Sequence, residues 1–141
     1  MSLITLIPPI LGIFGLFVAF KIYQRVMQYE TGNEKVTKIA EAIHEGAMVF
    51  MRREYRMMGS FAAILVILLL FMLGVKTAFA FVVGAGASAL AGYIGMFSAT
   101  QANVRTTTAA HEKGASEALT IAFFGGSIMG LSVASMGLLG L

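Results

Sequence analysis

A stretch of 22 residues without a charged side chain, from Ala78 to Ala99, constrains this chain more than any other feature. As a helix it measures about 33 Å, enough to cross the roughly 30 Å hydrocarbon core of a bilayer. Small residues recur in it at every fourth position, in the rows Gly84, Ser88, Gly92 and Ala87, Ala91, Gly95, Ala99. A row at this spacing forms one helix face, and small side chains let helices approach closely in lipid. We therefore expect a transmembrane helix with Gly84, Ser88 and Gly92 as packing positions.

Three further uncharged runs, at residues 3–20, 59–75 and 118–141, are long enough to span a membrane or nearly so. Only 12% of the residues are charged, about half the share in a soluble domain. The last run repeats the spacing of small residues, with Gly126 and Gly130 as its packing positions. The sequence predicts an all-α membrane protein in which four transmembrane helices form a single unit.

The segment before the second run has the pattern of an amphipathic helix. Its apolar residues follow helical periodicity from Glu34 to Met58, so we expect a cytoplasmic helical extension there. Either Thr31 together with Glu34, or Asn33 alone, is suited to cap its first turn. Glu34 and Lys38 have the spacing of an ion pair along one helix face.

Two segments connect the last three predicted helices. Lys76 and Thr77 are expected to form a very short turn that joins antiparallel helices. Residues 100–117 form either a polar loop or a continuation of the third helix that ends in a turn at Gly114. The chain stops at Leu141 without a polar or aromatic anchor, and from this we expect a truncated sequence.

The distribution of Lys and Arg predicts the orientation of the chain. Seven of the ten lie in residues 21–58, one in the turn after the second run, and two in residues 100–117. Cytoplasmic loops are the ones enriched in Lys and Arg, so we expect a multi-pass protein of the cell membrane with its N-terminus outside the cytoplasm. The cluster Arg52, Arg53, Tyr55 and Arg56 directly precedes a span and is predicted to lie at the membrane interface. A phosphate site is the less favoured reading of these arginines.

No catalytic residue and no metal site emerges from the sequence. The chain contains neither Asp nor Cys, and a net charge of +3 without clustering does not indicate nucleic-acid binding. His44 and His111 each precede a Glu, yet solvated histidines are favoured over a metal pair because no third ligand lies nearby. Gly84, Gly86 and Ala89 match a dinucleotide-binding fingerprint, but the acidic residue that should follow is missing, and helix packing explains the glycines.

Asn103 and Arg105 end the uncharged run of the third helix and are candidate structural anchors. Arg105 is equally suited to face the membrane edge or to pair with a carboxylate on a neighbouring helix. None of the four spans contains Asp, Glu, Lys, Arg or His, and such residues mark ion pathways in membranes. The four helices are therefore predicted to form a wall rather than an ion path.

Three stretches together resemble one family: GNEKVTKIAEAIHEGAMVFMRREY at 32–55, GAGASALAGYIGMFSATQANVRTTTAA at 84–110 and ALTIAFFGGSIMGLSVASMGLLGL at 118–141. They are similar to the N-terminal four helices of the membrane-integral, ion-pumping inorganic pyrophosphatases. The resemblance covers nearly all of the chain from Gly32 onward.

The resemblance implies a much longer parent that hydrolyses Mg-pyrophosphate and moves H⁺ or Na⁺, with this chain as an N-terminal part of a larger helical bundle. It implies Mg²⁺ as the parent's cofactor, later helices of the parent and the lipid bilayer as partners, and a homodimeric assembly. The Asp-rich hydrolytic motifs of the family have no counterpart here, so the segment alone is predicted to be inactive. The alternatives are a free-standing four-helix protein with an assembly role and, less favoured, a small transporter.

Overall fold

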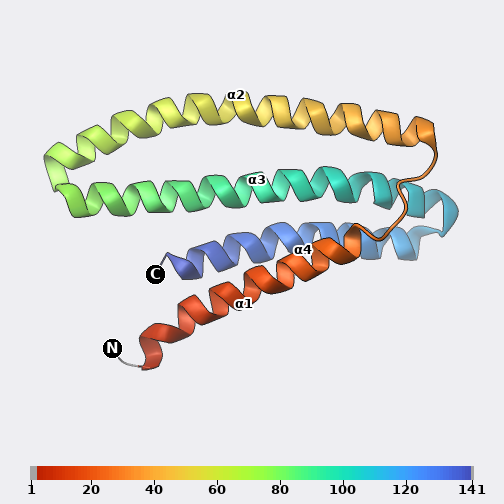
Figure 1. Cartoon of the computed structure of the whole chain (residues 1–141), viewed down its shortest axis with the longest axis horizontal. Coiled ribbons are helices and arrows are strands. Elements are labelled where there is room, and N and C mark those ends of the chain that lie inside the picture. The colour runs from red at the N-terminus through yellow and green to blue at the C-terminus, as the bar shows by residue number, and fades with distance from the viewer. Residues whose placement is uncertain (1–2, 141) are drawn as a thin grey trace.

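The structure, a computed structural model, describes residues 3–140 and consists of long helices (Figure 1). They are α1 (Leu3–Val26), α2 (Glu34–Leu73), α3 (Val75–Glu112) and α4 (Ala115–Leu139). Each is long and apolar enough to cross a membrane. The predicted all-α fold with four candidate membrane spans is therefore confirmed.

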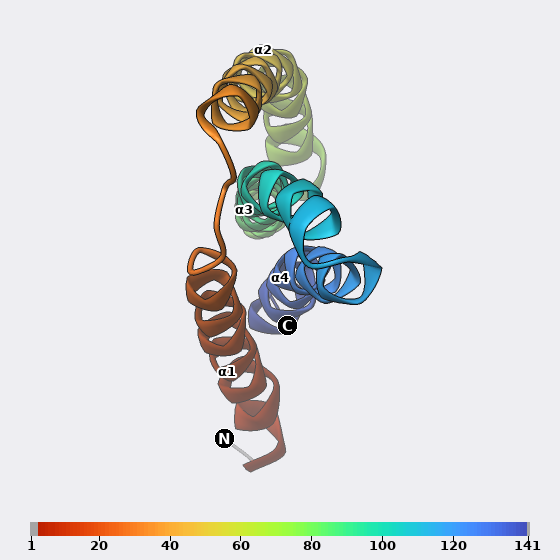
Figure 2. The ribbon, with the colours of Figure 1, turned by 90° about the vertical axis from the view of Figure 1, so that its right-hand side faces the viewer.

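The helices pack in a spatial order that differs from their order in the chain. α1 packs on α4, α4 on α3, and α3 on α2, while α1 touches α3 only slightly. Figure 2 looks along the helices and shows α2, α3 and α4 following one another, with α1 beside α4. Within the described residues α2 has α3 as its only helical neighbour, which leaves most of its circumference uncovered.

Each interhelical turn contains one glycine in the left-handed region, with φ of +84° at Gly32, +84° at Gly74 and +90° at Gly114. Glycine tolerates this conformation because it has no Cβ. The expected turn at Lys76 and Thr77 is wrong, since both residues belong to α3 and Gly74 alone separates the helices. Of the two readings of residues 100–117, the helical one is observed, because α3 continues to Glu112 before the turn at Gly114.

The first turn of α2 has the expected local interactions. The side chain of Asn33 accepts a hydrogen bond from the backbone N–H of Val36 at 3.0 Å, so Asn33 is the cap. Glu34 and Lys38 form the predicted ion pair, with 2.7 Å between Oε1 and Nζ. Both side chains are exposed, so the pair contributes little to stability.

The core lies around one half of α3, away from the α2–α3 turn. Ten residues of α3 are buried, and nine of these fall between Ala91 and Ala109. Val26, Ala102 and Ile128 form one buried cluster that joins α1, α3 and α4. α2, in contrast, has Met51 as its one buried residue. The uncharged run of α3 thus divides into an exposed part near Gly74 and a packed part beyond it.

Candidate functional site

Two hydrogen bonds fix the register of α2 against α3. The hydroxyl of Tyr55 donates to the carbonyl oxygen of Ala89 at 2.6 Å. Further along the two helices, Nδ1 of His44 lies 2.6 Å from Oγ1 of Thr100. The partners are 11 residues apart on each helix, about three α-helical turns. The two long helices are therefore in a constant antiparallel register over this region.

The register places the basic cluster at a defined level of the molecule. Because Tyr55 lies level with Ala89, its neighbours Arg52, Arg53 and Arg56 lie at about the same height. All three arginines are exposed. Arg53 and Arg56 line a groove of about 570 Å³ with Phe50, Glu54, Met57 and Ser60. Since Met51 and Tyr55 face α3, the groove lies on the outer face of α2.

His44 is part of a small polar and aromatic contact between α2 and α3. Its Nδ1 atom is 2.6 Å from Oγ1 of Thr100, and its ring meets the ring of Phe97 edge-on with 5.1 Å between centroids. The hydroxyl of Thr100 itself donates to the carbonyl oxygen of Phe97 at 2.9 Å. His111, by comparison, is exposed in the last turn of α3. The structure does not bring the two histidines into one polar contact.

Arg105 is almost fully buried, with 5% of its surface exposed. Its Nη1 atom donates to the backbone carbonyl of Gln101 at 2.7 Å and to Oε1 of the same residue at 3.1 Å. Its Nε atom is buried and has no hydrogen-bond partner among the described residues. Asn103 lies on the exposed surface of α3. The two candidate anchor residues therefore occupy different environments, and Arg105 has that of an interior residue.

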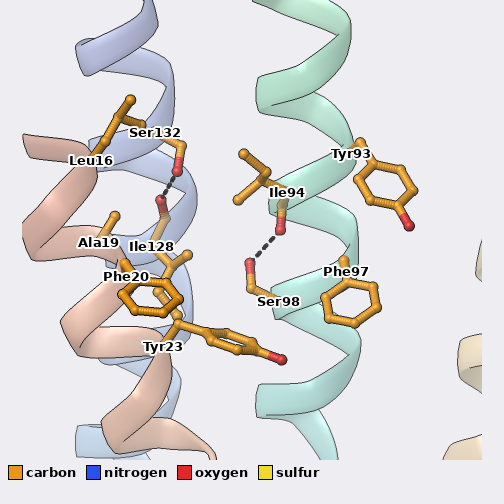
Figure 3. Close-up of a pocket in the computed structure, with 10 residues that line it drawn as sticks. All are labelled: Leu16, Ala19, Phe20, Tyr23, Tyr93, Ile94, Phe97, Ser98, Ile128 and Ser132. Atoms are coloured by element: carbon orange, nitrogen blue, oxygen red, sulfur yellow. Dashed lines mark hydrogen bonds between the residues drawn. The ribbon is translucent and has the colours of Figure 1, made fainter. Parts of the chain in front are cut away.

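A cavity of about 360 Å³ lies between α1, α3 and α4. Figure 3 shows its lining, with Tyr23 reaching from α1 toward α3. The two serines in the lining bond to their own helices, Ser98 to the carbonyl of Ile94 at 2.6 Å and Ser132 to that of Ile128 at 2.7 Å. Its remaining lining residues are aliphatic or aromatic: Leu16, Ala19, Phe20, Tyr93 and Phe97. The cavity thus offers an apolar surface rather than ligands for an ion.

The five predicted packing positions differ in how closely other helices approach them. A Cβ at Gly84, Gly126 or Gly130 would meet no atom within 4 Å, and all three residues are exposed. Ser88 is exposed as well and lines a groove of about 610 Å³ between α3 and the last turns of α4. Gly92 does pack, because a Cβ there would lie 2.9 Å from the hydroxyl oxygen of Tyr55. Three of the five positions, Gly84, Gly126 and Gly130, therefore have no close helical partner within the described chain.

The close approaches observed are at other small residues. A Cβ at Gly125 would lie 2.5 Å from Cβ of Ala102, and one at Gly95 would lie 2.7 Å from Cγ of Met129. Gly12 and Gly15 of α1 approach Ser135 of α4 in the same way. Gly95 belongs to the second of the two small-residue rows read from the sequence. The row that contains Gly95 therefore predicts the α3–α4 contact. Both rows have the same spacing, so the sequence alone does not show which of them packs on α4.

The remaining sequence motifs give no binding site. Gly84, Gly86 and Ala89 lie inside the continuous helix α3, whereas a dinucleotide fingerprint needs a strand and a turn before its helix. Within residues 3–140, no three side chains of His or Glu come together as metal ligands. Sequence reasoning missed Gln101 as a polar partner, although its i, i+4 spacing from Arg105 places both on one helix face. It also missed Thr100, because no spacing within one helix marks a contact with His44 on another.

Comparison with known proteins gives one consistent result. Residues 13–141 match the family model described as inorganic H⁺ pyrophosphatase. The chain is 43% identical over 134 residues to a K(+)-insensitive pyrophosphate-energized proton pump of Methanosarcina mazei, covering 94% of this chain and 20% of that protein. It is 45% identical over 130 residues to K(+)-insensitive pyrophosphate-energized proton pump 2 of Moorella thermoacetica, with 92% and 19% covered.

The name of a third relative refers to sodium instead of protons. The chain is 43% identical over 121 residues to a Clostridium tetani protein whose name proposes a K(+)-stimulated pyrophosphate-energized sodium pump. This match covers 85% of the chain and 18% of that protein. The chain thus spans about a fifth of the length of the relatives it matches.

Proposed function

Because the chain belongs to the family of inorganic H⁺ pyrophosphatases, we propose that it forms the N-terminal outer-helix segment of a membrane pump. The pump would couple the hydrolysis of pyrophosphate to the transport of H⁺ or Na⁺, the two ions in the names of the relatives. In this proposal the segment supports helices that lie beyond it and carries no hydrolytic residue of its own.

The uncovered face of α4 is the observation that supports this role. Leu119 and Phe123 expose 72% and 71% of their surface, and Ala122 between them is exposed too. Gly125 packs on Ala102, which lies 13 residues beyond Ala89 and therefore about 20 Å beyond the level of the arginine cluster. If the arginines mark the headgroups, this face lies outside the hydrocarbon core.

An apolar helix face outside the hydrocarbon core is unfavourable in water and requires cover. The exposed row on α4 includes Gly126 and Gly130, whose small size suits contact with another helix. Gly84 and Ser88 supply a second exposed surface of small residues on α3, on the side of Ala89 that faces the α2–α3 turn. We propose that later helices of the pump pack on both surfaces, which gives these exposed packing positions their role.

The position in the membrane follows from the register of α2. Arg56 precedes the α2–α3 turn by 18 residues, about 27 Å of helix, which matches the hydrocarbon core. We propose that Arg52, Arg53 and Arg56 contact headgroups at the cytoplasmic surface, with Tyr55 at the same depth. α1 begins and α4 ends toward the side of the α2–α3 turn (Figure 1), so the N-terminus would face away from the cytoplasm.

Mg²⁺ and the homodimeric assembly belong to the same proposal. The described part of this chain offers no group of carboxylates that fits Mg²⁺, so the ion would be held by residues elsewhere in the pump. Family resemblance supports a homodimer of the complete pump.

A chimera tests the proposal directly. The aligned fifth of the Methanosarcina mazei pump is replaced by this chain, and pyrophosphate hydrolysis and ion uptake are measured in vesicles. We expect both activities in the chimera and neither in the 141-residue chain alone. A chimera that is inserted and stable but does not hydrolyse pyrophosphate contradicts the proposal, and so does hydrolysis by the chain alone.

A further inference from the structure

The guanidinium of Arg105 has one satisfied side and one unsatisfied side. Both of its hydrogen bonds are donated by Nη1 to Gln101. The opposite edge, formed by Nε and Nη2, donates no hydrogen bond to the described residues, and Nε is fully buried. Oγ1 of Thr108, one turn further on the same face of α3, is also buried without a partner.

The charge of Arg105 is unbalanced as well. Within residues 3–140 the ion pair formed is Lys38 with Glu34, and no carboxylate lies within 4.0 Å of Arg105. Burying an ion without a counter-charge costs several kcal/mol even after local relaxation, because desolvation is not offset. A chain that positions Arg105 with Gln101 and leaves Nη2 without a partner has the form of half of an ion pair.

We propose that Nη2 of Arg105 donates a hydrogen bond to a carboxylate from a helix of the pump that lies beyond this chain, an inference that rests on the proposed function. Nη2 has no partner among the described residues and is not one of the fully buried atoms, so a group outside the chain can reach it, whereas Nε is covered by the chain itself. A charge-assisted hydrogen bond from a guanidinium to a carboxylate is short and strong. A single negative charge balances Arg105, whereas a phosphate dianion would need a second cation, and the arginines of α2 lie about 20–25 Å away along the helix axis.

The first experiment uses the 141-residue chain alone in nanodiscs and measures its thermal unfolding. Arg105→Met keeps the length of the side chain and removes the charge. We expect this variant to unfold at a higher temperature than the wild type by roughly 3 °C or more, since it removes an uncompensated ion. Arg25→Met, which removes an exposed arginine of α1, is the matched control and should leave the midpoint nearly unchanged.

The second experiment adds sodium acetate, with sodium chloride and sodium phosphate at equal ionic strength as comparisons. We expect acetate to raise the midpoint of the wild type by roughly 2 °C, and to have no such effect on Arg105→Met or Arg105→Lys. A response to phosphate but not to acetate overturns the assignment to a carboxylate. A wild type that is more stable than Arg105→Met and indifferent to acetate shows that Arg105 is already satisfied within the chain, which overturns the proposal.

The third experiment places Arg105→Met in the chimeric pump. In the pump, Arg105→Met should lower the unfolding midpoint instead of raising it, because the substitution would leave the partner carboxylate unpaired. We also expect at least a tenfold loss of hydrolysis. If the chimera fails for other reasons, the proposed function fails while the acetate test still decides whether Arg105 binds a carboxylate. If the chimera is active and Arg105→Met stabilises it, the ion pair is ruled out.

Discussion

His44 donates a hydrogen bond from Nδ1 to Oγ1 of Thr100 across 2.6 Å. The direction follows from the partner, because the single hydroxyl hydrogen of Thr100 is used for the carbonyl of Phe97. The imidazole must therefore supply the hydrogen, and the neutral ring carries it on Nδ1.

Replacing Thr100 by Val should destabilise the chain, because the Nδ1–H of His44 then loses its acceptor. The expected cost is about 1–3 kcal/mol, measured as the change in unfolding free energy. Thr100→Ser keeps the hydroxyl and is the control. In ¹⁵N NMR spectra the neutral ring of the wild type should show the Nδ1–H tautomer; a dominant Nε2–H tautomer would contradict the assigned direction of the bond.

Gly92 and Tyr55 should behave as a coupled pair. A methyl group at position 92 would lie 2.9 Å from the hydroxyl oxygen of Tyr55, too close without a shift of that side chain. Gly92→Ala should therefore lower stability by about 1 kcal/mol or more in the wild type, and by less in a Tyr55→Phe background, where the hydroxyl is absent. A double-mutant cycle of unfolding free energies measures the coupling. Strict additivity would show that the two residues do not meet.

Two adjacent glycines of α4 provide a matched comparison. Gly125→Ala places a methyl group 2.5 Å from Cβ of Ala102 and should destabilise the chain by about 1–3 kcal/mol. Gly126→Ala meets no atom within 4 Å and should be neutral or stabilising by up to about 1 kcal/mol, because alanine favours the helix. In the chimeric pump Gly126→Ala should instead reduce stability. Equal effects of the two substitutions in the chain alone would contradict the described α3–α4 interface.

The sequence was sufficient to predict the helices themselves. Charge-free runs of fixed length predict the four helices, since the bilayer thickness sets the length of any spanning helix. The turn glycine Gly114 and the cap Asn33 were each among the alternatives, because each residue type suits its backbone conformation. The turn at Gly74 was missed, because the uncharged run continues to Val75 and the polar pair Lys76 and Thr77 indicated a connection after it.

Helix partners were harder to predict. Both small-residue rows of α3 have the same spacing, so the pattern alone does not say that Gly95 meets α4 while Gly84 remains exposed. The burial of Arg105 was also beyond a single sequence, because it depends on how α1 and α4 close around α3. Register and neighbour choice are properties of the assembled helices, whereas helix length and type are local.

The depth of the helices in the membrane can be tested with single cysteines, because the chain has no native Cys. Val49 and Phe71 on α2 expose 61% and 84% of their surface. Val49 lies beyond the arginine cluster and Phe71 lies next to the turn at Gly74, within the proposed hydrocarbon core. A water-soluble maleimide should therefore label Val49→Cys and leave Phe71→Cys largely unlabelled in vesicles, although Phe71 is the more exposed of the two.

The same reagent tests the cover on α4. Phe123→Cys should be labelled in the 141-residue chain, because its side chain is 71% exposed and lies outside the proposed membrane core. In the chimeric pump it should be protected at least tenfold, since later helices would exclude water from this face. Val49→Cys in the same chimera shows that the reagent reaches the cytoplasmic side. Protection of Phe123→Cys already in the chain alone would place this face in lipid, and would then remove the reason for assigning it to other helices.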